Sequence, residues 1–141
     1  MGYWLLKSEP SSWSWDQQAA AGEAGTPWTG VRNHAAKNNL QAMRVGDEAF
    51  FYHSNERLAI VGLVQVIREY YLDPTDETGR FGMVDVKAVR ALLHPVGLDR
   101  IKAELALKGM RLVTHSRLSV QPVTNEEWRM VCRMGGLPDA S

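Results

Sequence analysis

The strongest structural signal in this chain is a long β-rich run, LAIVGLVQVIREYY, at residues 58–71. β-Branched and aromatic residues of this kind favour strands. Up to Ile67 the run is apolar on both faces, because apolar residues fill successive positions and do not alternate with polar ones. We therefore predict a long strand in a sheet that is covered on both sides.

Other segments predict further strands around this one. They are residues 3–7, 48–53, 83–92 and 117–121. The strands are mostly consecutive, without the regular strand-helix alternation of a parallel sheet. We expect an α+β fold: a small mixed or antiparallel β-barrel with flanking helices. Residues 95–97 should end the strand at 83–92, and residues 22–30 and 73–82 should be loops.

Helices are predicted at 14–21, 34–43 and 98–108, with a last one that begins after Thr124. Two of them start with a capping box, in which a hydroxyl at the N-cap pairs with Gln or Glu three residues later. These pairs are Ser14 with Gln17 and Thr124 with Glu127. The stripe of the helix at 98–108 is Leu98, Ile101 and Leu105. We find no repeat or linker and treat residues 1–141 as one domain.

Charge and cysteine content narrow the possible functions. The chain has 16 basic and 16 acidic residues, so it should not hold nucleic acid mainly through phosphates. Any nucleic-acid contact should be local, in a pocket or at a small basic rim. One cysteine, Cys132, indicates a reducing compartment, and we expect a cytoplasmic protein. Nothing resembles a membrane span or a signal peptide, and a monomer is the expected state.

Familiar catalytic and metal motifs are missing from the sequence. It contains no GxGxxG, Walker, HExxH or CxxC pattern, and its four histidines are isolated. Cys132 lies on the apolar stripe of the last helix, which favours a buried thiol over a nucleophile. We therefore expect no metal, no cofactor and no catalytic group.

Four stretches instead place polar groups beside aromatic or apolar runs at predicted strand ends and loops. They are Lys7-Ser8-Glu9, Trp28 to Asn33, Phe50 to Ser54, and Arg117-Leu118-Ser119. Loops at strand ends on a rigid scaffold are common positions for binding sites.

Motifs through nearly the whole chain resemble the EVE domain family. They are YWLLKSEP at 3–10, WTGVRNHAAKNNLQAMRVGD at 28–47, FFYHS at 50–54, IVGLVQVIREYYLDPT at 60–75 and SRLSVQPVTNEEW at 116–128. Five motifs in the right order form a specific match. The resemblance implies a fold similar to PUA domains and to the YTH domains that bind methylated adenine in RNA. It also implies recognition of modified bases, especially 5-methylcytosine and its oxidised forms in DNA, or of a modified base in RNA.

The residue types fit that implication, since a flipped base needs an aromatic face and hydrogen-bonding groups for its edge. Trp28 is the candidate platform, and Gly30 would let the backbone approach closely. Candidate edge contacts are Ser8, Asn33, Tyr52, His53 and Ser54. Candidate phosphate contacts are Lys7, Arg32 and Arg117, while Glu9 and Trp13 would complete the wall and rim.

Structural roles compete with these assignments. Asn33 can be the N-cap of the second helix, Lys7 and Glu9 can form an exposed salt bridge, and Arg117 can anchor the last helix.

Two other functions also stay open. One is an enzyme similar to the ASCH domains that hydrolyse modified nucleosides, with Lys7 and Glu9 in the active site. That family's spaced pattern of Lys, Thr and Glu is not matched by the contiguous Lys7-Ser8-Glu9. The other is a protein-interaction module that uses a surface patch and no pocket.

Overall fold

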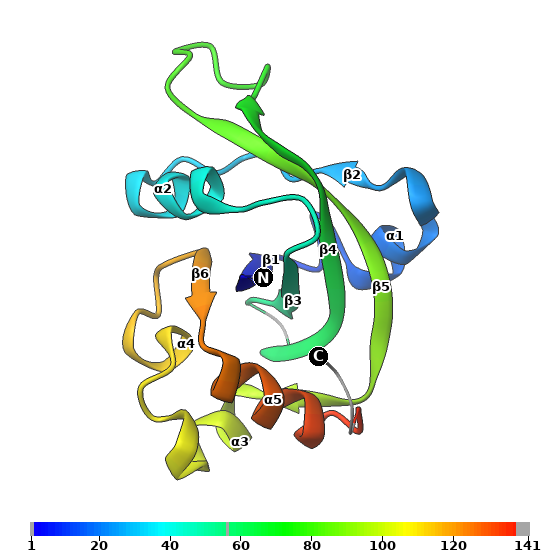
Figure 1. The fold of residues 1–141 in the computed structure, drawn as a ribbon, viewed down its shortest axis with the longest axis vertical. Coiled ribbons are helices and arrows are strands. Elements are labelled where there is room, and N and C mark those ends of the chain that lie inside the picture. The colour runs from blue at the N-terminus through cyan, green and yellow to red at the C-terminus, as the bar shows by residue number, and fades with distance from the viewer. Residues whose placement is uncertain (1, 56, 138–141) are drawn as a thin grey trace.

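The computed structural model describes residues 2–55 and 57–137. Six strands and a set of short helices follow one another along the chain (Figure 1). The strands are β1 (Tyr3–Ser8), β2 (Thr26–Pro27), β3 (Glu48–His53), β4 (Ala59–Leu72), β5 (Gly82–Gly97) and β6 (Val120–Val123). The α-helices are α1 (Trp15–Ala20), α2 (His34–Ala42), α3 (Leu98–Ala103), α4 (Arg111–Thr114) and α5 (Asn125–Met134), and two 3-10 turns are η1 (Gly22–Ala24) and η2 (Leu105–Leu107).

All six strands form one mixed sheet in the order β2-β5-β4-β3-β1-β6. β1 and β3 run parallel, and the other neighbours are antiparallel. The sheet does not close into a barrel, so the expectation of a barrel was wrong in this respect, although the α+β class is confirmed. The short edge strands explain why the sheet stays open. β2 has two residues and β6 has four, and each contains a proline, which has no N–H to donate to a further strand.

Helix α2 packs near the opening of the sheet. It contacts β6, β5 and β4, and it lies above β6 in the view of Figure 1. The side-chain amide of Asn39 donates to the carbonyl of Val120 in β6 at 2.7 Å. Helix α2 therefore lies against β6 at the edge where strands would pair in a closed barrel.

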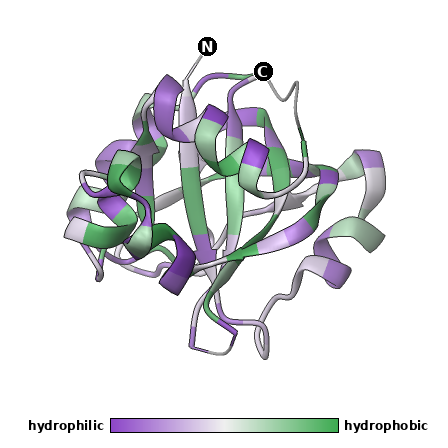
Figure 2. Cartoon of the chain, turned by 90° about the horizontal axis from the view of Figure 1, so that it is seen from below, coloured by the Kyte–Doolittle hydropathy of each residue, from purple (hydrophilic) through white to green (hydrophobic). Residues whose placement is uncertain are grey.

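The sheet is covered on both faces, as the run at 58–71 predicted. One face carries Leu6, Phe51 and Val64 under α2, and the other carries Leu5, Phe50 and Leu63 under the C-terminal helices. Phe50 and Phe51 are adjacent and both fully buried, because successive side chains of a strand point to opposite faces. In Figure 2 the strands carry long green stretches, and the helices around them alternate between green and purple.

Boundaries in the second half of the chain differ from the prediction. β5 continues through Pro95 to Gly97, because its partner β4 offers a pairing register there. The helix expected at 98–108 ends at Ala103 and gives way to η2, so Leu105 is exposed and Leu107 is buried in its place. Three further short elements, η1, β2 and α4, were not predicted.

The last strand also begins later than expected, at Val120, so residues 117–119 precede it. Both capping boxes are confirmed. Ser14 and Gln17 start α1, and Thr124 and Glu127 start α5, each pair with its two reciprocal hydrogen bonds.

Candidate functional site

A cavity of about 670 Å³ lies where the end of β1 meets the loop around β2. Its lining residues come from two stretches of the chain: Lys7, Ser8, Glu9, Ser12 and Trp13, and Thr26, Pro27, Trp28, Thr29 and Gly30. Clefts of roughly 300–1,000 Å³ are typical of small-molecule sites, so the cavity has room for a nucleobase.

The end of β1 turns into the cavity wall through local hydrogen bonds. The backbone carbonyl of Glu9 accepts from the N–H groups of Ser12 and Trp13, each at 2.9 Å. The hydroxyl of Ser8 donates to the carbonyl of Trp13 at 2.5 Å. Residues 8–13 therefore form a tight turn that carries the chain from β1 to α1.

A buried glutamine holds the side chains above this turn. Gln18 is fully buried, and its Oε1 accepts from the Trp13 indole N–H at 2.8 Å and from the Thr26 hydroxyl at 3.1 Å. Its Nε2 donates to the carbonyl of Val86 at 3.3 Å. Gln18 thus fixes one side chain from each of the two lining stretches against β5.

Trp28 is a wall residue whose indole is mostly inside the protein. It is only 7% exposed, and its ring packs edge-on against Phe51 at a centroid distance of 5.5 Å. Its backbone N–H donates to the carbonyl of Val84 at 2.8 Å. Trp28 therefore belongs to the core as well as to the cavity, and the half-buried Trp13 presents more of its surface.

Asp73, at the end of the β4–β5 hairpin's first strand, holds the far side of the cavity. Its Oδ2 accepts from the backbone N–H of Gly30 at 3.0 Å and from Arg32 at 3.2 Å. Its Oδ1 accepts from the hydroxyl and the N–H of Thr75. Burial alone would raise the pKa of Asp73, but these donors outweigh burial and lower the pKa to about 2.

The ammonium of Lys7 is directed to a neighbouring loop. Its Nζ donates to the carbonyl of Ser116 at 2.7 Å and lies 5.9 Å from the centre of the Tyr52 ring. Burial lowers the pKa of Lys7. Among the described residues we find no ion pair between Lys7 and Glu9, so the alternative of a salt bridge between them is not supported.

The residues predicted from the end of β3 lie behind the wall. Tyr52 is 3% exposed in the core of the opposite face. His53 accepts at Nε2 from the N–H of Trp15 at 3.1 Å, and burial lowers the pKa of His53. The backbone N–H of Ser54 donates to the carbonyl of Ser8 at 2.9 Å. All three support the cavity without lining it.

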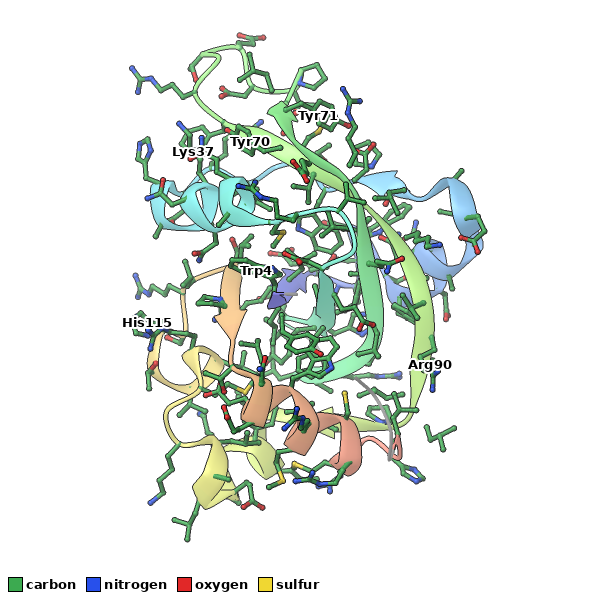
Figure 3. The ribbon with its side chains drawn as sticks, in the orientation of Figure 1. Trp4, Lys37, Tyr70, Tyr71, Arg90 and His115 are labelled. Atoms are coloured by element: carbon green, nitrogen blue, oxygen red, sulfur yellow. The ribbon has the colours of Figure 1, made fainter. Side chains whose placement is uncertain are left out.

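A second hollow, of about 390 Å³, contains two other predicted residues. It is lined by Asn33, Ala35, His115, Ser116, Arg117 and Leu118. Asn33 is the N-cap of α2, as one reading of the sequence had it, and its Oδ1 accepts from the N–H of Ala36 at 2.9 Å. His115 lies in the loop between α4 and β6, below α2 in Figure 3.

The structure thus brings together part of the predicted set. Lys7, Ser8, Glu9, Trp13 and Trp28 line the main cavity. Arg32, Asn33, Tyr52, His53, Ser54 and Arg117 do not, and whether any of the eleven binds a ligand stays a prediction. Sequence reasoning missed the lining residues Ser12, Thr26 and Pro27 and the positioning residue Asp73. The only available signal for Asp73 was its place inside the motif at 60–75.

The described residues contain no group of three or more His, Cys, Asp or Glu side chains that could hold a metal ion. Within the same residues we find no helix of the length and apolarity that a membrane crossing requires.

Comparison with known proteins identifies the family. Residues 2–134 match the family model for the EVE domain. The chain belongs to the EVE domain family. It is 39% identical to rat (Rattus norvegicus) thymocyte nuclear protein 1 over 161 aligned residues, which cover 92% of this chain and 71% of the rat protein.

Solved structures of EVE relatives superpose closely on this chain. Rpa0253 from Rhodopseudomonas palustris is 60% identical with a TM-score of 0.93, covering 99% of this chain and 97% of that one. Human THYN1, solved in complex with DNA containing 5-methylcytosine, is 35% identical with a TM-score of 0.88, covering 96% and 98%. The YTH domain of Zygosaccharomyces rouxii MRB1 is 12% identical with a TM-score of 0.59, covering 99% and 86%, which shows a shared fold.

Proposed function

We propose that this protein is a non-catalytic reader that binds a modified nucleobase, 5-methylcytosine or an oxidised derivative in DNA, in the cavity between Trp13 and Trp28. One observation carries the proposal. A relative that matches nearly the whole chain at 35% identity was solved in complex with DNA that contains 5-methylcytosine. The shared EVE fold makes the same ligand class the first expectation here.

The chemistry of the cavity supports a base as its occupant. Trp13, Pro27 and the exposed edge of Trp28 give it apolar surface, and stacking of a base on an aromatic side chain contributes about 1–3 kcal/mol. Hydroxyl groups of Ser12, Thr26 and Thr29 and the carboxylate of Glu9 supply polar atoms at the wall. A flat, partly polar ligand matches this combination.

A base enters such a cavity only from a single strand or after it is flipped out of a duplex. The flanking backbone then needs a few cations rather than a broad basic surface, which agrees with a net charge of zero. Arg117, in the second hollow, is exposed and has no ion-pair partner among the described residues. We propose that it contacts a phosphate beside the flipped base.

Binding without turnover is the version of the proposal that the site favours. A hydrolase built on Lys7 and Glu9 would need the amine to act on the ligand as a base. The ammonium of Lys7 instead donates to the carbonyl of Ser116. The depressed pKa of Lys7 has a structural cause, since the side chain is partly buried in that contact.

The test is a titration of the full chain with short DNA and RNA oligomers, each with one central cytosine, 5-methylcytosine, 5-hydroxymethylcytosine or N6-methyladenine. Tryptophan fluorescence and calorimetry give the affinities, and chromatography of the recovered oligomers detects turnover. We expect tighter binding of a modified cytosine than of cytosine in DNA and no new product. Equal affinity for all four bases would contradict the proposal, and so would release of a hydrolysed base.

A further inference from the structure

Hydrogen-bond donors around the main cavity are largely used by the protein itself. The hydroxyl of Ser8 donates to the carbonyl of Trp13. The hydroxyl of Thr26 and the indole N–H of Trp13 both donate to Oε1 of Gln18. Each hydroxyl oxygen keeps lone pairs that can accept a bond, but its hydrogen is committed.

Other donors at the wall are committed in the same way. The backbone N–H of Trp28 donates to Val84, and that of Gly30 donates to Asp73. The ammonium of Lys7 donates one of its three hydrogens to the carbonyl of Ser116. The donors that the described residues leave free at the wall are therefore the remaining ammonium hydrogens of Lys7 and the exposed hydroxyls of Ser12 and Thr29.

Glu9 is the strongest hydrogen-bond acceptor among the residues that line the main cavity. Its side chain is exposed at the cavity wall and takes part in no ion pair or hydrogen bond that the described part of the chain provides. Its backbone carbonyl accepts from the N–H groups of Ser12 and Trp13 in the turn. A carboxylate with both oxygens free favours a ligand edge that donates.

We infer that Glu9 is the specificity-determining residue that accepts the exocyclic amino group of a cytosine-type base and rejects thymine. The inference rests on the proposed function. 5-Methylcytosine and thymine carry the same 5-methyl group, so stacking and methyl contacts cannot separate them. They differ along the pairing edge, where cytosine has an amino donor at position 4 and thymine has a carbonyl acceptor.

A carboxylate distinguishes these two edges by charge and by hydrogen bonding. It accepts from the amino group, whereas it repels the carbonyl oxygen at position 4 of thymine. The thymine N–H at position 3 lies between two carbonyl oxygens, so an approach to it brings a carboxylate oxygen against one of them. The hydroxyls of Ser12 and Thr29 belong to residues that line the same cavity, and they supply donors for the ring acceptors that cytosine retains.

The test compares wild type with Glu9→Gln, because a glutamine amide can accept from an amino group and also donate to a carbonyl. The ligands are DNA duplexes in which cytosine, 5-methylcytosine, thymine or uracil faces an abasic site, so that no base has a pairing partner to lose. Wild type should bind 5-methylcytosine more than tenfold more tightly than thymine. Glu9→Gln should reduce this ratio roughly tenfold, the size expected for one good base-edge contact.

Glu126→Gln is the matched control, since it removes the same charge from another exposed glutamate, in the first turn of α5. It should keep the wild-type ratio. If Glu9→Gln also keeps that ratio while wild type prefers 5-methylcytosine to cytosine, the inference is overturned and the proposed function stands. If wild type binds none of the bases, or does not separate 5-methylcytosine from cytosine, the proposed function fails and the inference fails with it.

Discussion

The carboxylate of Asp73 accepts a hydrogen bond from the backbone N–H of Gly30 at 3.0 Å, across 43 positions of the chain. The same oxygen accepts from Arg32, two residues further along the loop. This contact joins the loop that lines the cavity to the end of the long β4 strand. The position of the wall therefore depends on a residue that does not itself line the cavity.

Replacing Asp73 by Asn should loosen this wall. The variant loses the ion pair with Arg32 and part of the bonding to Thr75, and removal of a buried partner costs about 1–3 kcal/mol of unfolding free energy. Urea unfolding measures the stability, and a titration with 5-methylcytosine DNA measures binding. Asp76→Asn is the control, because the carboxylate of Asp76 accepts from residues of its own hairpin turn, Thr78, Arg80 and Phe81. Equal loss of affinity in both variants would contradict a specific role of Asp73.

The free energy of unfolding should also fall in acid, because protonation of Asp73 weakens the same contacts. The pKa of Asp73 is about 2 in the folded protein, below its ordinary value of 3.8, so the folded state binds the proton less readily than the unfolded chain. The contribution, about 1–2 kcal/mol, is present above pH 4 and is lost as the pH falls toward 2. Urea midpoints between pH 7 and pH 2.5 measure it. Asp73→Asn should show a shallower decline, and an identical decline in both proteins would refute the assignment.

Trp13 and Trp4, two of the half-buried tryptophans, offer a matched pair for testing the cavity. Each indole N–H donates to an internal acceptor, Gln18 for Trp13 and Asp47 for Trp4, and only Trp13 lines the cavity. Both changes to Leu should lower stability. Trp13→Leu alone should weaken binding of modified DNA, by about 1–3 kcal/mol for a lost stacking surface. Calorimetric titration decides, and unchanged affinity in Trp13→Leu would remove Trp13 from the site.

Trp28→Ala would not test binding alone, because it also disturbs the core. The Trp28 ring packs against Phe51, and removing a buried tryptophan costs about 3–5 kcal/mol of stability. We expect a large drop in the urea midpoint of this variant whatever the cavity binds. A midpoint within error of wild type would show that Trp28 contributes little to the core.

Alanine variants of Gly30 and Gly22 distinguish the effect of backbone strain from the effect of obstructing the cavity. Both have a positive φ, +84° for Gly30 and +61° for Gly22, and an added Cβ would meet open space at each. Alanine should therefore cost each variant about 1 kcal/mol of stability through strain. Only Gly30 lines the cavity, so Gly30→Ala should also weaken ligand binding. Thermal melts and titrations compare them, and equal binding by both variants would show that the added methyl group does not obstruct the ligand.

Local signals gave reliable predictions of local structure. The capping boxes at Ser14 and Thr124 were predicted correctly, because each depends on hydrogen bonds between residues three apart. The coverage of both faces of β4 up to Val66 followed from the apolar residues that fill most successive positions there. Five motifs sufficed to assign the EVE family, which residues 2–134 confirm.

Closure of the sheet and the membership of the site depended on contacts between distant segments. No local pattern tells whether β6 will pair with a further strand or lie against α2, so the expected barrel is an open sheet. Likewise, Arg32 and Trp28 are close in sequence but differ in their role. The Arg32 guanidinium donates to Asp73 and does not line the cavity, whereas the Trp28 ring packs against Phe51 at the cavity wall.

The helix starts, the doubly covered strand and the family can be predicted from residue types and their short spacings. Which polar residues share one cavity depends instead on how the whole chain packs. The fold places the ammonium of Lys7 against the carbonyl of Ser116, 109 positions away, and puts Glu9 and Trp13 on the wall of one cavity. The physical reason is that a polar side chain takes whichever partner the packed core brings within reach, and that partner is fixed by the whole fold.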